Sequence, residues 1–202
     1  MALSTSDSKG SKKFLSVVGG KISQKVTAET PNAVKRINKN GAEIWELQFG
    51  SVSGIIRDIK LKEDATYGNQ YEITIQDADE SYLLQIPQSG RLASSLLSRI
   101  PNMDRTGYVQ IDTWAIQEDG KTKQFLTVRQ NDKVVQPFYS KDNPNGLPSM
   151  VQVKIKGVMQ WDDSDQLEFY KGKVAEWFTA KPTTSPVADS GPEDEESQNL
   201  PF

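Results

Sequence analysis

The chain has 202 residues and contains neither cysteine nor histidine. This length suits one well-buried domain with appendages, and the missing side chains exclude disulfides, thiolate or imidazole metal ligands, a cysteine nucleophile and every catalytic triad with an imidazole base. The net charge is −3, yet residues 1–40 carry eight Lys/Arg against two acids and residues 181–202 carry one Lys against five acids. This polarity suits a basic part that meets a polyanion, although two solvated ends would show the same charges.

The N-terminal residues offer little to bury. Residues 1–13 are rich in Ser and Lys, and the apolar run 14–18 is far shorter than the roughly 20 residues of a membrane span. We therefore expect a soluble, cytoplasmic protein whose residues 1–40 form a basic, partly disordered extension. Between residues 14 and 40 the pattern does not distinguish an added strand, a helix and a basic arm.

A strand is indicated from Gly41 onward, where apolar residues begin to alternate with polar ones. We expect it to run on through residues 52–62, with Gly54 as the bend or bulge of a strand that serves both sides of a small barrel. The first part carries Trp45, Leu47 and Phe49 on one face, opposite Glu46 and Gln48, and the second part is expected to face inward with Ile55, Ile59 and Leu61. The outward face of the second part is expected to carry Asp58, Lys60 and Lys62.

The next elements alternate between hairpins and a helix. Residues 71–75 and 82–86 indicate a hairpin, and apolar residues recur at helical spacing from Leu92 to Ile100. Residues 108–117 and 122–130 then predict two more strands joined by a tight loop. Three strands, a helix and two strands is the order of the OB-fold, so we expect an all-β fold, mainly β with one short helix, built as a five-stranded Greek-key barrel.

The remainder of the chain is expected to extend this barrel. A Pro/Gly/Asn-rich connection over 131–149 leads to two strand-like runs, Val151–Val158 and Leu167–Phe178. We expect these runs to form an added hairpin (150–178) packed on the barrel, so that residues 41–180 make one OB-fold domain. Residues 181–202, dominated by Pro, Ser, Thr and acids, are expected to be a disordered acidic tail.

The last two barrel strands carry an unusual surface. Alternation places inward the side chains of Val109, Ile111, Thr113, Ala115, Leu126 and Val128. The other face then carries the aromatic residues Tyr108, Trp114 and Phe125 among Lys121, Lys123 and Arg129. Single-stranded nucleic acid needs this combination, because cations track the phosphates while aromatic rings stack on the bases. The alternative is that the three aromatic side chains pack beneath the added hairpin.

Further DNA-binding residues are expected at the ends of this surface. OB-folds bind ligands across strands two and three, bounded by the loop after strand one and the loop after strand four. The first of these regions holds Lys60, Lys62 and Tyr67, and the added hairpin supplies Lys154 and Lys156. The aromatic residues that could extend the groove there are Phe138, Tyr139, Trp161 and Tyr170. We expect no metal, no cofactor and no catalytic residue.

The end of the chain carries the most specific motif. An acidic run, Glu193, Asp194, Glu195 and Glu196, is followed by Leu200, Pro201 and Phe202. This end resembles the C-terminal tip of bacterial single-stranded DNA-binding proteins, and phage proteins of the same function commonly end in acids and an aromatic residue. A terminal Phe with its carboxylate fits an apolar pocket rimmed by Arg or Lys, and the acids steer the encounter. The resemblance implies replication, recombination and repair, with a tail that docks on polymerases, helicases or nucleases.

The resemblance covers about the last 14 residues closely and the barrel by strand order alone. The long basic extension, the added hairpin and the lack of a long Gly/Gln-rich linker depart from bacterial members. These departures favour a phage-encoded relative, which would act in the host cytoplasm. They also leave the oligomeric state and self-association on DNA open.

Two other functions stay open on the sequence. The carboxylates of Asp162, Asp163, Asp165 and Glu168, with Lys171, could hold Mg²⁺ near a phosphate in a metal-dependent nuclease. The spacing argues against it, because restriction-type nucleases place the acid one position from the catalytic lysine, and a solvated turn explains the acids more simply. A protein-interaction or oligosaccharide-binding module can use the same barrel, and binding that weakens steeply with salt would favour nucleic acid over either.

Overall fold

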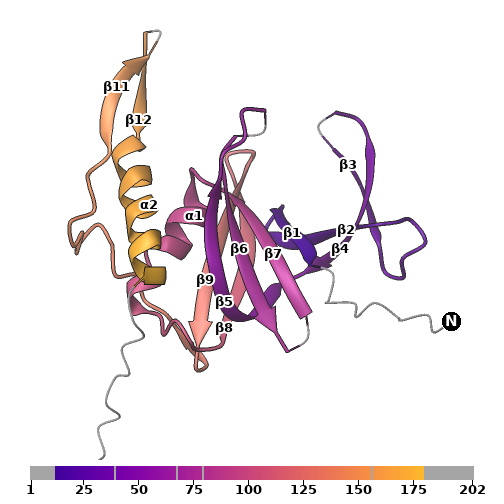
Figure 1. The fold of residues 1–202 in the computed structure, drawn as a ribbon. Helices are drawn as coiled ribbons and strands as arrows, with labels where there is room; N and C mark the ends of the chain where they lie inside the picture. The colour runs from indigo at the N-terminus through magenta and orange to yellow at the C-terminus, as the bar shows by residue number, and fades with distance from the viewer. Residues whose placement is uncertain (1–11, 39, 67, 79, 156, 180–202) are drawn as a thin grey trace, which may run out of the picture.

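The computed structural model describes residues 12–38, 40–66, 68–78, 80–155 and 157–179, which form a mainly β protein (Figure 1). The expected fold class is thereby confirmed at this level. Ten strands make one sheet in the order β10-β9-β8-β5-β6-β7-β1-β2-β4-β3. These strands are β1 (Lys13–Val18), β2 (Lys21–Val26), β3 (Val34–Ile37), β4 (Glu43–Phe49), β5 (Ser51–Lys62), β6 (Gln70–Asp77), β7 (Glu80–Pro87), β8 (Val109–Glu118), β9 (Lys121–Gln130) and β10 (Lys133–Val134).

The elements expected between residues 51 and 130 occur in the expected order. β5, β6 and β7 pair antiparallel, the chain continues through α1 (Arg91–Leu97) and a 3₁₀ turn, η1 (Ile100–Asn102), and β8 and β9 form a hairpin. Apolar side chains of α1 complete the core because they recur on one face of the helix. The core includes Leu92, Leu96 and Leu97 from α1 and Ile73, Ile75, Leu84, Ile86, Val109, Ile111 and Val128 from the sheet.

β5 serves two neighbours because it bends at Gly54, as the sequence predicts. Residues 51–54 pair with β8, and residues 55–62 pair with β6. The φ angle of Gly54 is 148°, and a Cβ at this position would lie 2.6 Å from the carbonyl oxygen of Gln76. Only glycine therefore fits here without a shift of the backbone.

A bulge in β5 changes which side chains face the core. The register of β5 against β6 shifts between Ile56 and Asp58, and a bulge of this kind interrupts strict alternation. Ile56 and Ile59 are buried, whereas Ile55 is half-buried. The prediction of Ile55 as the inward residue is therefore wrong, and Ile56 takes its place.

Most of the segment 14–40, which the sequence leaves open, forms the strands β1, β2 and β3. β1 pairs in parallel with β7, with Leu15 opposite Leu84, and β2 pairs with both β1 and β4. The β1–β2 turn reaches the β8–β9 hairpin, where the Gly20 N–H donates to the Gln124 side chain at 3.2 Å. A Cβ on Gly20 would lie 2.5 Å from the backbone nitrogen of Ala115, so the contact requires glycine. The basic extension is thus part of the sheet from Lys13 onward.

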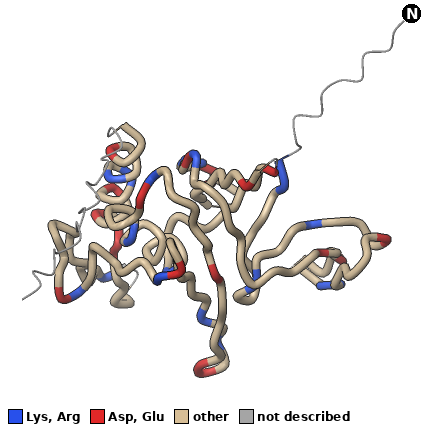
Figure 2. Tube along the Cα trace, turned by 90° about the horizontal axis from the view of Figure 1, so that it is seen from below, with Lys and Arg blue, Asp and Glu red and all other residues tan. Residues whose placement is uncertain are grey.

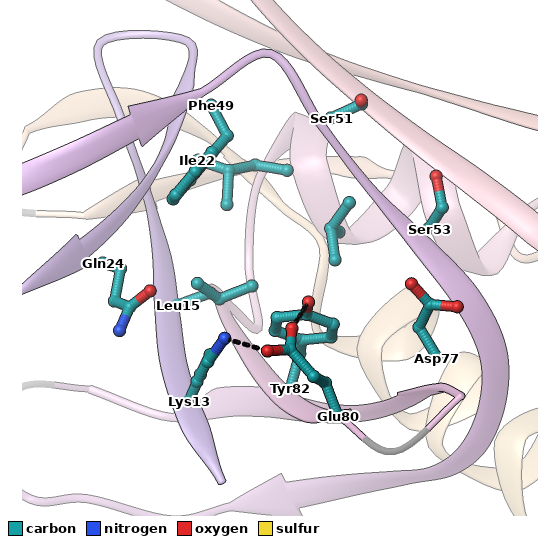
Figure 3. Close-up of a pocket in the computed structure, with 11 residues that line it drawn as sticks. Lys13, Leu15, Ile22, Gln24, Phe49, Ser51, Ser53, Asp77, Glu80 and Tyr82 are labelled. Atoms are coloured by element: carbon teal, nitrogen blue, oxygen red, sulfur yellow. Dashed lines mark hydrogen bonds and ion pairs between the residues drawn. The ribbon is translucent and has the colours of Figure 1, made fainter.

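A hollow of about 390 Å³ lies where β1 meets β7 (Figure 3). Beside it Lys13 forms an ion pair with Glu80, and the Tyr82 hydroxyl donates to the same carboxylate. The hydrogen bond to Glu80 raises the pKa of Tyr82 to about 12, and the bonds from Lys13 and Tyr82 lower the pKa of Glu80. These contacts fasten the start of β1 to the start of β7.

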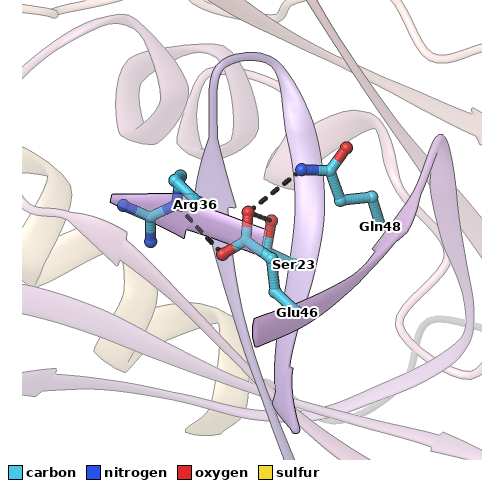
Figure 4. A network of polar contacts seen from close by, with 4 residues as sticks. All are labelled: Ser23, Arg36, Glu46 and Gln48. Atoms are coloured by element: carbon cyan, nitrogen blue, oxygen red, sulfur yellow. Dashed lines mark hydrogen bonds and ion pairs between the residues drawn. The ribbon is translucent and has the colours of Figure 1, made fainter. Parts of the chain in front are cut away.

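A buried carboxylate holds β2, β3 and β4 together (Figure 4). Glu46 of β4 is 2% exposed and accepts hydrogen bonds from Arg36 Nε at 3.1 Å, Ser23 Oγ at 3.3 Å and Gln48 Nε2 at 3.0 Å. Glu46 and Phe49 lie on opposite faces, as the alternation predicts, but Glu46 is the buried one, whereas Phe49, expected to pack in the core or across strands, is 40% exposed. A buried carboxylate is tolerated when it is hydrogen-bonded, and Glu46 accepts hydrogen bonds from three side chains.

The C-terminal segment contains a separate two-stranded sheet and a helix. β11 (Val151–Ile155) and β12 (Val158–Asp162) pair antiparallel, and α2 (Ser164–Thr179) follows directly. Asp162 begins the helix by accepting hydrogen bonds from the N–H and hydroxyl of Ser164, which lower the pKa of its carboxyl. Within the described residues, neither α-helix has the length and apolar character needed to cross a membrane.

The strand predicted over Leu167–Phe178 is wrong, because these residues belong to α2. Apolar side chains at Leu167, Tyr170, Val174 and Trp177 are three or four residues apart, which is helical spacing. Tyr170 and Val174 are buried, and Phe169 meets Tyr139 edge to face at 5.1 Å. Aromatic pairs in this geometry are favourable contacts, so they help to hold α2 in place.

Candidate nucleic-acid interface

Two aromatic side chains stack on the outward face of the β8–β9 hairpin. Trp114 and Phe125 are directly opposite each other in the strand register. Their ring centroids are 4.4 Å apart and their planes differ by 15°. Trp114 is 46% exposed and Phe125 is half-buried. We call this pair the aromatic platform.

The inward and outward faces of this hairpin match the prediction. Val109, Ile111, Leu126 and Val128 are buried, whereas Tyr108 and Trp114 are exposed. The alternative in which the C-terminal segment covers the aromatic residues is therefore wrong for Tyr108 and Trp114. Large rings left open to solvent on a strand face are candidates for contacts with a ligand.

A cation from α1 extends the platform. The guanidinium of Arg91, the first residue of the helix, lies 5.4 Å from the centre of the Phe125 ring. This distance allows a cation–π contact, so Trp114, Phe125 and Arg91 form a row that crosses from β8 through β9 to α1. Arg91 could not be predicted as part of this site, because 34 positions separate it from Phe125 and no periodicity links the two residues.

The charges beside the platform are largely arranged in ion pairs. Arg129 Nε lies 2.8 Å from Asp112 Oδ2, and Lys123 pairs with Glu118. Cations and acids also alternate along the rest of the trace (Figure 2). Together with Arg91, the outward side chains of β8 and β9 supply four cations against two carboxylates. The face is therefore basic, but phosphates must compete with Asp112 and Glu118 for two of its cations.

A hollow of about 380 Å³ adjoins Trp114 on the same face. Its lining offers donors and acceptors as well as the edge of the indole ring, and consists of Gln110, Asp112, Trp114, Thr127, Arg129 and Asp132. A base that stacks on Trp114 would meet these polar groups with its edge, and a phosphate would meet Arg129. The arrangement suits a nucleotide with its base unpaired.

Replacing Asp112 with Asn should tighten binding of single-stranded DNA by about two- to fivefold, because Arg129 loses its ion-pair partner and becomes available to phosphate. The slope of log affinity against log salt should steepen by about 0.7, the contribution of one more phosphate contact to a single strand. Fluorescence titration at several salt concentrations measures both. Asp119→Asn, in the β8–β9 turn, makes the same change of net charge and should have the smaller effect; weaker binding by Asp112→Asn would contradict the expectation.

Three other predicted DNA-binding residues lie away from the platform. Tyr108 directly precedes β8 and is six positions before Trp114, about 20 Å at the usual rise per residue of a strand. Its hydroxyl donates to Asp77 at 2.9 Å, which raises its pKa. Two lysines of β5 form ion pairs: Lys60 Nζ lies 2.8 Å from Asp58 Oδ2, and Lys62 Nζ lies 3.6 Å from Glu72 Oε1. These three residues are therefore not brought together with the aromatic pair.

The strands expected to bear the ligand do not carry the aromatic rings. The face of β6 and β7 opposite to Ile73 and Ile75 carries polar or aliphatic side chains, of which Leu83 is buried: Gln70, Glu72, Thr74, Gln76, Ser81, Leu83 and Gln85. The platform lies on β8 and β9 instead. The rings that could stack on bases therefore lie on the last hairpin of the expected barrel and not on its second and third strands.

The remaining predicted site residues divide into two groups. Lys121 and Lys154 are exposed, the first at the β8–β9 turn and the second on β11. The others lie outside the described residues: Tyr67, Lys156, Glu193, Asp194, Glu195, Glu196, Leu200, Pro201 and Phe202.

The acids near residue 165 have structural partners. Asp162 accepts the hydrogen bonds that begin α2, and Glu168 lies 3.6 Å from Lys171 one turn along the helix. They flank a strand-to-helix junction rather than the turn between two strands that the sequence suggested. In the part of the chain that the structure describes, no three acidic side chains gather in a way that could hold a metal ion.

Comparison of the chain with protein-family models, with curated proteins and with solved structures gives no match. The residues of the interface must therefore carry the functional argument by their own chemistry.

Proposed function

We propose that the protein binds single-stranded DNA, coating and protecting it during replication, recombination and repair. The observation that carries the proposal is the aromatic platform: Trp114 and Phe125 stack at 4.4 Å on an open strand face, with Arg91 5.4 Å from the second ring. Exposed rings among cations bind unpaired bases, because each stack contributes about 1–3 kcal/mol with little sequence preference. A duplex hides the same base faces and offers the platform nothing to stack on.

We propose further that β5 to β9 form an OB-type barrel. The strand order, the position of α1 between β7 and β8, and the pairing of β8 with β5 support this assignment. β1 is the parallel partner of β7, so the N-terminal strands take part in the same sheet. Such a barrel presents its last hairpin at the surface, where the platform lies.

We propose that the protein binds DNA without cleaving it. Asp162 already serves the start of α2, and Glu168 already pairs with Lys171. Incubation with single-stranded DNA and Mg²⁺ should therefore leave the DNA intact. Metal-dependent loss of full-length DNA would instead support the enzyme.

The decisive experiment is a titration of the fluorescence of the four Trp residues with poly-dT and with duplex DNA of equal length, at two salt concentrations. Strong quenching by poly-dT that weakens at high salt would support stacking together with phosphate contacts. The same response to both DNAs would contradict single-strand specificity. No response to either would favour a protein-interaction module on the same scaffold.

The acidic end of the chain is proposed to recruit partner proteins. Deleting residues 181–202 should leave DNA binding unchanged or tighten it, because the acids no longer compete with DNA for basic groups, and should abolish binding of a purified polymerase, helicase or nuclease from the same source. Titration with poly-dT and a binding assay with each partner measure the two effects. Weaker DNA binding by the shortened chain would contradict this role of the tail.

A further inference from the structure

The β11–β12 hairpin exposes an unusual amount of apolar surface. Figure 1 shows it projecting beyond the N-terminal end of α2, and Val158, Met159 and Trp161 are 54–63% exposed. An isolated two-stranded hairpin is marginally stable in water, and clustered apolar side chains on a surface indicate an interaction site. The exposed apolar side chains of the hairpin therefore indicate a surface that contacts a partner.

The strand register sorts these side chains onto two different faces. Met159 is opposite Lys154, and Trp161 is opposite Gln152. Since side chains alternate along a strand, these four lie on one face, which we call the hairpin face. Val158 and Gln160 lie on the other. The hairpin face thus carries an open aromatic ring and a methionine beside a cation and an amide.

A basic groove adjoins the hairpin face. Trp161 is part of the wall of a groove of about 650 Å³ between α1, the loop before β11 and α2, which also includes Arg99 and Lys141. A smaller hollow of about 220 Å³ beside it is lined by Met150, Ser94 and Arg91. Ser94 and Met150 line both spaces, so the two are neighbours.

Arg91 connects this groove to the platform. Its side chain lines the smaller hollow and also lies over the Phe125 ring. A path therefore runs from Trp114 and Phe125 past Arg91, along α1, to Trp161. The charged residues that line the two spaces are Arg91, Arg99 and Lys141 against Asp163, a net positive lining that complements a polyanion.

We propose that the hairpin face is a second contact for single-stranded DNA, in which Trp161 stacks on a base and Lys154 meets a phosphate. The strand that occupies the platform continues past Arg91 through the groove to reach it. This inference rests on the proposed function, because it concerns the path of the same ligand. Sequence-tolerant stacking at both ends of the path would lengthen the site without adding base preference.

The test compares Trp161→Ala with Val158→Ala in the full chain, using dT oligomers of about 5 and about 16 nucleotides, near the ends of the range of known site sizes. Trp161→Ala should weaken binding of the longer oligomer by about 5- to 150-fold, the effect of one lost stack, and leave binding of the shorter oligomer unchanged. Val158→Ala removes an equally exposed side chain from the other face of the hairpin and should change neither affinity.

A second measurement reports the contact directly. In a variant that keeps Trp161 as its single Trp, with Trp45, Trp114 and Trp177 replaced by Phe, the longer oligomer should quench fluorescence and the shorter one should not. Equal affinity of wild type and Trp161→Ala for both oligomers, with no quenching of Trp161, would overturn the second contact while leaving the proposed function intact. Failure of the wild type to bind either oligomer would overturn both.

Self-association gives the remaining outcome. If sedimentation shows a dimer of the free protein that Trp161→Ala dissociates, the hairpin face binds a second copy of the chain, and the DNA contact is overturned. A monomer that binds the longer oligomer more tightly than Trp161→Ala does supports the DNA contact.

Discussion

Replacing Trp114 and Phe125 together with Ala should weaken binding of poly-dT by about 5- to 150-fold. One stack on a base contributes about 1–3 kcal/mol, and the double variant loses the stack on Trp114. Phe125 itself lies between Trp114 and Arg91, so it supports the Trp114 ring. The unfolding free energy should fall by only about 1 kcal/mol, the contribution of one cross-strand aromatic pair, because Trp114 is nearly half exposed. Fluorescence is unsuitable for a variant without Trp114, so anisotropy of labelled dT gives the affinity and urea unfolding gives the stability.

The control for this double variant is Tyr108→Ala. Tyr108 directly precedes the same strand with 51% exposure, but it lies away from the platform and its hydroxyl is bonded to Asp77. We expect Tyr108→Ala to lower the affinity far less. Unchanged affinity in the double variant, or a large fall in its melting temperature, would assign Trp114 and Phe125 to packing instead.

Replacing Arg36 with Ala should lower the unfolding free energy by about 3 kcal/mol. Removing one partner of a buried ion pair leaves the other charge without compensation, and the Glu46 carboxylate is almost fully buried while Arg36 is its charged donor. Ser23 and Gln48 remain as neutral donors and keep the loss at the low end of the range for such pairs. Urea unfolding of the two proteins measures the difference.

The neighbouring pair gives a matched control. Lys35 pairs with Glu43 on the same two strands, but both side chains are about half exposed, so Lys35→Ala should cost less than about 1 kcal/mol. Adding Glu46→Gln to Arg36→Ala should recover part of the stability, because the buried charge is then removed. Equal losses in Arg36→Ala and Lys35→Ala would show that burial of Glu46 does not govern this part of the sheet.

Patterns within single strands predicted much of the central fold. Alternation identified β8 and β9 and separated the inward Ile111 from the outward Trp114, because a strand with one buried face has a strict period of two. Gly54 predicts a bend, because a strand shared by two neighbours needs a residue without a side chain at the point where it turns. The bulge beside it was not visible, since an extra residue disturbs alternation without leaving a characteristic motif.

Features that depend on distant partners could not be predicted. A glutamate in a strand is typical of a solvent-facing position. Burial of Glu46 is tolerated because Arg36 of β3 donates a hydrogen bond to its carboxylate. Arg91 directly precedes the apolar positions of the predicted helix, and no feature of the sequence indicates its contact with the Phe125 ring. The helix α2 was misread because its aromatic residues favour strands, while its packing against Tyr139 favours the helix.

The parallel pairing of β1 with β7 sets the order in which the protein assembles. β1 is translated first among the described strands, but the partner of Leu15 is Leu84, about 70 residues later. At roughly 5–20 residues per second, β1 waits several seconds for β7 during synthesis, and closing so long a loop is slow. Until β1 docks, the edge of β7 is an open template for strands of other chains. A chain that lacks β1 would keep that edge open and should aggregate as it is made.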